Sequence, residues 1–154
     1  MPALTPIRFL TAHQLSHLYR RSILAASPTQ PTLFASALDA PANNFHFGAT
    51  TSIHALAAIL ATRLITNHAF MDGNKRVGML AAHALLKMNG WRIRPEVLVE
   101  MEMLDAGNGR IIEAAVLVAR GMWDEDELAA FLREISVQES QVCERSSRTK
   151  VESR

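Results

Sequence analysis

Apolar residues recur at helical spacing along most of the chain. The strongest pattern lies at residues 51–66, where they follow one another at intervals of three and four, as on one face of an α-helix. A second strong pattern starts near residue 77 and ends before Gly90, a residue typical of helix C-caps. Weaker patterns predict helices at residues 11–25, 31–38, 95–104, 109–119 and 124–135. We therefore expect an all-α fold, a compact bundle of six or seven helices.

Two of these helices begin with a capping-box pattern. Thr11 is followed three residues later by Gln14, and Asp124 is followed by Glu127 at the same spacing. In this pattern the first side chain accepts a hydrogen bond from a free backbone N–H, and the second side chain accepts one from the cap residue. Both spacings therefore predict where a helix starts.

Residues 40–50 interrupt the helical pattern. They contain Pro41 and Gly48 around an alternating Phe45-His46-Phe47 sequence, which suits a short extended segment better than a helix. We expect a short flap here, either a loop or a small hairpin.

The length of 154 residues suits one domain with a tail. We expect the domain at residues 1–136, followed by a polar, Ser-rich and disordered tail at residues 137–154. The single cysteine, Cys143, lies in that tail and has no partner for an internal disulfide. No apolar run approaches the ~20 residues of a membrane span. A soluble cytoplasmic protein without membrane contact is expected.

The net charge of +1 conceals an uneven distribution. Residues 1–94 carry 9 Lys/Arg and 2 Asp/Glu, whereas residues 95–154 carry 7 and 13, so the two parts have charges of +7 and −6. The basic residues are scattered rather than clustered, so direct nucleic-acid binding is not expected. Either the basic part binds a smaller phosphorylated molecule, or the two parts simply offset each other's charge.

The segment between the two strongest helices concentrates polar residues. It reads His68-Ala69-Phe70-Met71-Asp72-Gly73-Asn74-Lys75-Arg76, and the next helix is expected to begin inside it. The first N–H groups of a helix lack intrahelical partners and carry partial positive charge, so such an end binds anions. Gly73 permits close approach of the backbone, while Asn74, Lys75 and Arg76 add an amide and two cations. The segment therefore predicts a phosphate-binding site.

Three more residues of this segment indicate how such a site would work. A carboxylate beside a phosphate needs a cation between them, so Asp72 is expected to bind Mg²⁺. His68 precedes the helix, where a neutral imidazole can remove a proton from a hydroxyl group near pH 7. Phe70 is expected to point into the core. The alternative is a solvated loop capped by Asp72, but the combination favours transfer of a phosphorus group from a nucleotide to a hydroxyl.

These residues resemble the signature of the Fic/Doc superfamily. That signature reads His, any residue, Phe, any residue, Asp or Glu, Gly or Ala, Asn, Gly or Lys, Arg, and it is specific. The resemblance extends from about residue 11 to 135, more weakly outside the motif. It implies His68 as the catalytic base and Asp72 as the Mg²⁺ ligand. The residues that it implies for the phosphates of ATP are Gly73, Asn74, Lys75 and Arg76.

Two positions separate the branches of this superfamily. Fic-type enzymes, which transfer AMP from ATP to a protein hydroxyl, typically have Gly where this chain has Lys75 and a second Arg where it has Met79. Doc-type (death-on-curing) toxins have Lys at the first position and no Arg at the second. They bind the nucleotide reversed and transfer its γ-phosphate. The chain therefore resembles Doc more closely than Fic.

The resemblance to Doc also implies partners. Such toxins are held inactive by a separate antitoxin, and they inhibit translation by phosphorylating a translation factor, with elongation factor Tu the expected target. In relatives a flap docks the target segment as an added strand. This places Phe45, His46 and Phe47 as possible docking residues. A Fic-type protein adenylyltransferase and an inactive binding module remain the alternatives.

Overall fold

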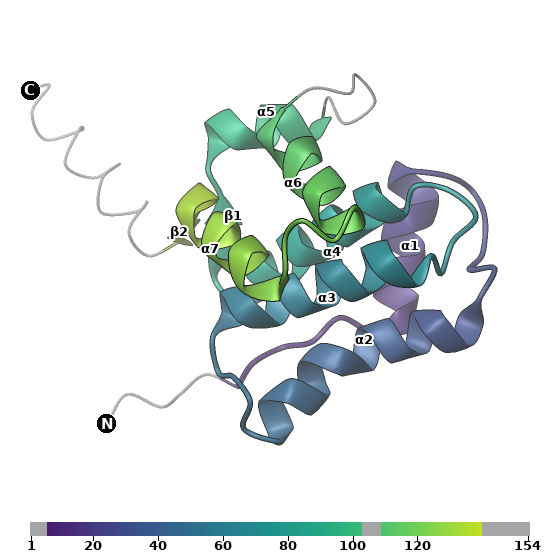
Figure 1. The fold of residues 1–154 in the computed structure, drawn as a ribbon, viewed down its shortest axis with the longest axis horizontal. Coiled ribbons are helices and arrows are strands. Elements are labelled where there is room, and N and C mark those ends of the chain that lie inside the picture. Colours follow the sequence, from purple (N-terminus) through teal and green to yellow (C-terminus); the bar gives the residue numbers. More distant parts are fainter. Residues whose placement is uncertain (1–5, 103–108, 140–154) are drawn as a thin grey trace, which may run out of the picture.

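A computed structural model describes residues 6–102 and 109–139, and within these ranges the fold is helical (Figure 1). Seven described helices accompany one antiparallel pair of short strands, β1 and β2. The helices are α1 (Ala12–Ser22), α2 (Pro31–His46), α3 (Ile53–Asn67), α4 (Asn74–Met88), α5 (Pro95–Glu102), α6 (Arg110–Ala119) and α7 (Glu125–Ile135). This confirms the expected helical fold class. None of the described helices is long and apolar enough to cross a membrane.

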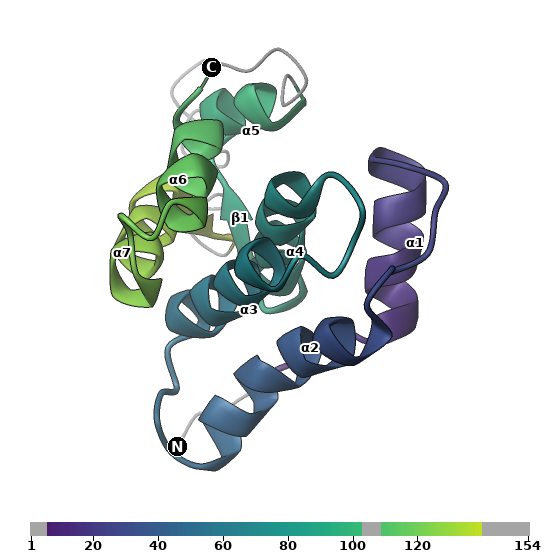
Figure 2. The ribbon, with the colours of Figure 1, turned by 45° about the vertical axis from the view of Figure 1, so that its right-hand side comes forward.

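Helix α3 lies at the centre of the fold. It packs against α4 most extensively, with α2 on one side and α6 and α7 on the other (Figures 1 and 2). The contact with α4 is close because Gly78 faces α3: a Cβ there would lie 2.6 Å from Cγ1 of Ile65 and 3.0 Å from the carbonyl oxygen of Ala61. This close packing brings the end of α3 beside the start of α4, which is where the polar segment lies.

Both predicted capping boxes are confirmed. The Thr11 hydroxyl accepts a hydrogen bond from the backbone N–H of Gln14, whose side chain accepts one from the N–H of Thr11. Asp124 and Glu127 make the same reciprocal pair at the start of α7. These motifs are predictable because each is formed within four consecutive residues.

The non-helical segment expected at residues 40–50 is wrong for residues 40–46, because α2 continues to His46 through the internal Pro41. Only residues 47–50 lie outside a helix. A proline inside a helix removes one backbone donor. The Asn44 side chain donates a hydrogen bond of 2.8 Å to the carbonyl of Ala40, next to the proline. Phe45 packs on the core with its ring centroid 5.9 Å from that of Phe9. Long-range packing therefore overrides the local signals against a helix.

The two strands are a feature that the sequence did not predict. β1 (Trp91–Ile93) pairs with β2 (Ser136–Gln138), and Arg92 lies opposite Val137. Three residues are too few to show an alternating pattern. β2 extends just past the domain boundary expected at residue 136, while residues 140–154, including Cys143, lie outside the described part of the chain.

A buried histidine links the strand pair to α3. His54 is 4% exposed, its Nε2 lies 2.8 Å from the hydroxyl of Ser136, and its ring contacts Trp91 edge-to-face with centroids 4.5 Å apart. Burial, and secondarily the positive charge of Arg133, lowers the pKa of His54 to about 4. His54 is therefore neutral in the folded protein at neutral pH.

We expect the folded state to lose stability between pH 6.5 and pH 4. Below pH 6.5 the unfolded chain binds a proton at His54 while the folded chain does not, so protonation favours unfolding. The expected loss from this residue between pH 7 and pH 5 is about 1–2 kcal/mol, allowing for solvent screening. Urea unfolding at both pH values measures it. A His54→Leu variant should lack this part of the loss, and an equal loss in both proteins would contradict the assignment.

Candidate active site

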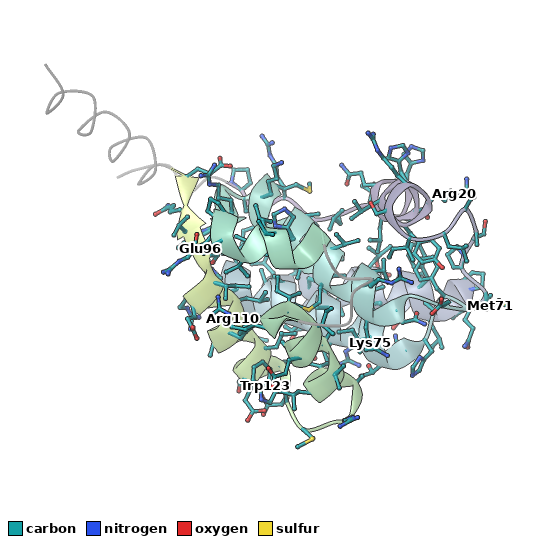
Figure 3. The ribbon with its side chains drawn as sticks, turned by 90° about the horizontal axis from the view of Figure 1, so that it is seen from above. Arg20, Met71, Lys75, Glu96, Arg110 and Trp123 are labelled. Atoms are coloured by element: carbon teal, nitrogen blue, oxygen red, sulfur yellow. The ribbon has the colours of Figure 1, made fainter. Side chains whose placement is uncertain are left out.

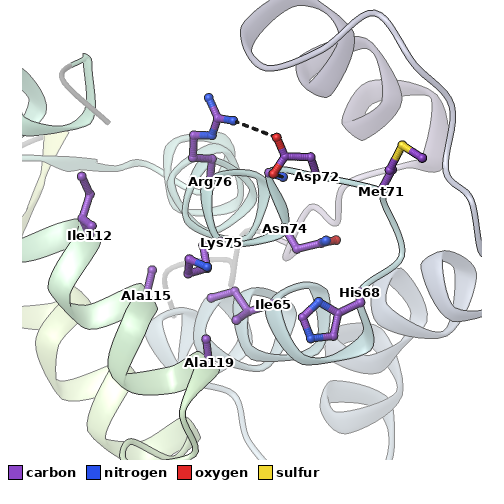
Figure 4. A pocket seen from close by; sticks show the side chains of 11 residues that line it. Ile65, His68, Met71, Asp72, Asn74, Lys75, Arg76, Ile112, Ala115 and Ala119 are labelled. Atoms are coloured by element: carbon purple, nitrogen blue, oxygen red, sulfur yellow. Dashed lines mark hydrogen bonds and ion pairs between the residues drawn. The ribbon is translucent and has the colours of Figure 1, made fainter. Parts of the chain in front are cut away.

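The end of α3, the start of α4 and one face of α6 enclose a cavity of about 460 Å³ (Figure 4). One side of it is polar and the other apolar. The residues that line it are Ile65, His68, Met71, Asp72, Gly73, Asn74, Lys75, Arg76, Ile112, Ala115 and Ala119. The structure therefore brings together all the residues that the sequence assigned to the base, the metal and the phosphate.

Gly73 forms the turn that starts α4. Its φ of +74° lies in the left-handed region, and it occupies the N-cap position without a side-chain cap. The N–H groups of the first turn, beginning at Asn74, therefore face the cavity end of the helix without intrahelical partners. A Cβ on Gly73 would lie 2.5 Å from Cγ2 of Ile23. Glycine is thus required here both by the backbone conformation and by the lack of space.

The Asn74 side chain has a different role from the one predicted for its amide. Its Oδ1 accepts a hydrogen bond of 3.0 Å from the N–H of Phe70, and its Nδ2 donates one of 2.8 Å to the carbonyl of the same residue. This pair of hydrogen bonds closes the loop before α4. What Asn74 can offer a phosphate is therefore chiefly its backbone N–H at the helix start.

Phe70 anchors the same loop in the core, as predicted. Its ring is 2% exposed and stacks on the ring of Tyr19, with centroids 3.8 Å apart and an interplanar angle of 19°. Phe34 meets it edge-on at 5.5 Å. These contacts fix the loop from α1 and α2, far from it in the sequence.

Tyr19 is a supporting residue that the sequence reasoning missed. It is fully buried on α1, and its hydroxyl donates a hydrogen bond of 2.9 Å to the carbonyl oxygen of Asp72. Burial raises the pKa of Tyr19, and the negative charge of Asp72 adds to the rise. The only sequence signal was an apolar position on α1, since its partner lies 53 residues away.

The connection between α1 and α2 also holds the loop. The backbone N–H groups of Thr29 and Gln30 both donate to the carbonyl of Ala69, at 2.9 and 3.2 Å. The Gln30 side chain donates a hydrogen bond of 3.3 Å to the carbonyl of His68. The N-terminal part of the fold thus holds the start of the polar segment at His68 and Ala69, and its middle at Asp72.

His68 ends α3 in an unusual conformation. It is the C-cap residue with φ of +49°, the only positive φ among the described non-glycine residues. Such a conformation costs about 1 kcal/mol for a residue with a Cβ and is typical of functional positions. The imidazole is exposed and lies on the cavity wall opposite Asp72 (Figure 4). A group in that place can reach a hydroxyl that enters from solvent.

Asp72 and the two basic residues form the charged side of the cavity. The Asp72 carboxylate is 78% exposed; its Oδ1 accepts a hydrogen bond of 2.6 Å from the N–H of Gly73, and its Oδ2 lies 3.8 Å from a guanidinium nitrogen of Arg76. Lys75 is exposed and lies beside α6 (Figures 3 and 4). Cations at this end add to the partial positive charge of the helix, which favours an anion.

Asp72 fits a Mg²⁺ site in which the protein supplies a single carboxylate. In the described part of the chain no three His, Cys, Asp or Glu side chains gather as a metal-binding group. Mg²⁺ commonly binds through one or two carboxylates together with substrate phosphates and water. The exposed Asp72 carboxylate beside the phosphate-binding end suits that arrangement, in which the nucleotide supplies the other ligands.

The predicted docking residues lie elsewhere. Phe45 and His46 are in the last turn of α2 and Phe47 follows it, at the opposite end of α3 from His68 (Figure 1). An α3 of 15 residues is about 22 Å long. These residues are therefore not part of the cavity, and their docking role stays a prediction.

The sequence patterns also did not predict the apolar wall of the cavity. Ile65 projects from α3, while Ile112, Ala115 and Ala119 project from α6. The sequence predicted α6 as a helix, but its periodicity did not show that one of its faces would meet the start of α4. Met79, where Fic-type enzymes have a second Arg, is 1% exposed and lies in the core rather than on the cavity wall.

Comparison with known protein families supports the resemblance of the motif. A match to the Fic/DOC family covers residues 7–86, just over half of the chain, and includes the whole polar segment. No curated protein matches the chain. Membership in this family implies a protein-modifying transferase, and such enzymes typically use a nucleotide substrate. The chain belongs to the Fic/DOC family.

Proposed function

We propose that this protein is a Doc-like kinase that transfers the γ-phosphate of ATP to a hydroxyl group of a protein. The observation that carries the proposal is that His68, Asp72, Lys75 and Arg76 line one cavity at the N-terminus of α4. A helix start with two added cations suits a phosphate chain, and an imidazole across the cavity suits an attacking hydroxyl.

In this reaction the hydroxyl oxygen attacks the γ-phosphorus as His68 removes its proton. The bond between the γ-phosphorus and the β,γ-bridging oxygen breaks, and ADP leaves with the electron pair. Lys75, Arg76 and the first backbone N–H groups of α4 stabilise the charge on the phosphate oxygens. Asp72 would hold Mg²⁺, which supplies further neutralisation of that charge when bound.

Two residues favour phosphoryl transfer over AMP transfer. Lys75 occupies a position where Fic-type enzymes have Gly, and its side chain occupies space beside α6 that Gly would leave open. Met79 is buried and uncharged, so it offers no second motif cation to a phosphate. Bulk at one position and a missing charge at the other change which phosphorus can face His68.

The biological role that we propose follows from the resemblance to Doc. The protein would act in the cytoplasm as the toxin of a toxin–antitoxin pair, with elongation factor Tu as its target and inhibition of translation as its effect. A cognate antitoxin would hold it inactive.

Two ATP samples, one labelled on the α-phosphorus and the other on the γ-phosphorus, test the reaction. Purified protein, Mg²⁺ and elongation factor Tu are incubated with each, and the mass of the target is measured as well. We expect label from the γ-position alone and a gain of one phosphate. Label from the α-position would instead establish AMP transfer, and an unmodified target would reject elongation factor Tu as the substrate.

A further inference from the structure

The peptide unit between Asp72 and Gly73 is hydrogen-bonded at both of its ends. Its carbonyl oxygen and its N–H point in opposite directions, because a peptide unit is planar and trans. The buried Tyr19 hydroxyl donates a hydrogen bond of 2.9 Å to the carbonyl oxygen. The N–H donates a hydrogen bond of 2.6 Å to Oδ1 of the Asp72 carboxylate, whose other oxygen faces Arg76 (Figure 4). The orientation of this peptide unit therefore affects where the carboxylate lies.

Glycine leaves the backbone free to adopt another orientation here. Gly73 has φ of +74°, and a residue without a Cβ adopts φ values of either sign at little cost. If the peptide unit reversed, its carbonyl oxygen would point towards the Asp72 carboxylate, which would lose its backbone donor. The hydrogen bond from Tyr19 favours the observed orientation, in which the carbonyl oxygen faces the hydroxyl.

The Tyr19 side chain has a fixed position of its own. It is fully buried on α1, and its ring stacks on that of Phe70 with centroids 3.8 Å apart. Ile23, the C-cap residue of α1, lies so close to Gly73 that a Cβ there would be 2.5 Å from its Cγ2. Helix α1 therefore packs closely against this turn as well as donating the hydrogen bond to it.

We infer that Tyr19 is a positioning residue for Mg²⁺, because its hydroxyl fixes the peptide unit that directs the Asp72 carboxylate. This inference rests on the proposed function, since it assumes that Asp72 binds Mg²⁺ together with the nucleotide. Tyr19 does not line the cavity, so it acts through Asp72 rather than by contact with ATP. Loss of a group that orients a metal ligand commonly lowers metal affinity by about 10-fold or more.

Phenylalanine at position 19 tests the assignment, because it keeps the stacked ring and removes only the hydroxyl. The affinity for ATP is measured by calorimetry with Mg²⁺ and again with EDTA, and the ratio of the two affinities gives the contribution of the metal. We expect Tyr19→Phe to lower this ratio by about 10-fold and to change the affinity in EDTA by less than about 2-fold. In an Asp72→Asn protein, Tyr19→Phe should have no further effect on the ratio.

A measurement without metal and a matched variant separate this role from a general loss of structure. In the protein without nucleotide or metal, Tyr19→Phe should shift the amide NMR resonance of Gly73 but not that of Gly90, beyond the other end of α4. Leu15→Val shortens another fully buried side chain of α1 and should change neither the Gly73 resonance nor the ratio.

The outcomes distinguish this inference from the proposed function. If Tyr19→Phe keeps the wild-type ratio, or weakens ATP binding equally with Mg²⁺ and with EDTA, then the inference is wrong and the proposed function stands. An effect of Tyr19→Phe that persists in the Asp72→Asn protein also overturns it. If the wild-type protein binds ATP equally well with Mg²⁺ and with EDTA, the proposed metal role of Asp72 fails, and this inference fails with it.

Discussion

Replacing His68 with alanine is expected to lower the rate of group transfer by about 10²–10⁴-fold, the usual contribution of a general base. The imidazole lies on the cavity wall and is exposed, so it can meet a hydroxyl that enters from solvent. The groups proposed to bind the phosphates belong to α4 and are left intact. The affinity for ATP should therefore change by less than about 2-fold, and the loss should fall on kcat.

A histidine variant outside the cavity makes this result specific. His13→Ala removes an exposed histidine of α1 that does not line the cavity, and its activity should equal that of the wild type. His68 also adopts a left-handed conformation, so alanine at this position is not expected to stabilise the loop. Full activity in the His68→Ala protein would exclude the imidazole as the base. An equal loss of ATP binding and turnover would give His68 a role in binding instead.

The parts of the fold that the sequence predicts correctly depend on signals from neighbouring residues. The helices α3 and α4 show uninterrupted apolar periodicity, and the starts of α1 and α7 carry complete capping boxes. The polar segment is equally local, because nine consecutive residues hold the histidine proposed as the base, the carboxylate and the two cations. Such local patterns predict a helix or a site without knowledge of the tertiary fold.

The features that escaped prediction depend on contacts between distant residues. Phe45 keeps α2 helical past Pro41 by packing against the core, and Tyr19 reaches the carbonyl of Asp72 across 53 residues. Nothing near Ala115 in the sequence indicates that it faces the cavity. Periodicity predicts that a helix has a buried face, but tertiary packing decides which element it meets.

Replacing Gly73 with alanine is expected to damage both the stability and the activity. At φ of +74° a Cβ costs about 1–2 kcal/mol, and this Cβ would also lie 2.5 Å from Cγ2 of Ile23. We expect a total loss of about 1–3 kcal/mol in the free energy of unfolding. Relief of the overlap would move the first turn of α4, and a displacement of about 1 Å can lower the rate by about 10²-fold. Urea unfolding and the transfer assay measure the two effects.

Gly90, the first glycine after α4, provides the matched control. Gly90 has φ of +81° at the opposite end of the same helix, and a Cβ there would meet no atom within 4 Å. Gly90→Ala should therefore show the conformational cost alone and retain full activity. In the Gly73→Ala protein, a second change of Ile23→Ala should recover the part of the stability lost to overlap, as a double-mutant cycle would measure. If Gly73→Ala and Gly90→Ala lose the same stability and keep the same activity, then the close contact at Gly73 has no part in shaping the phosphate-binding end of α4.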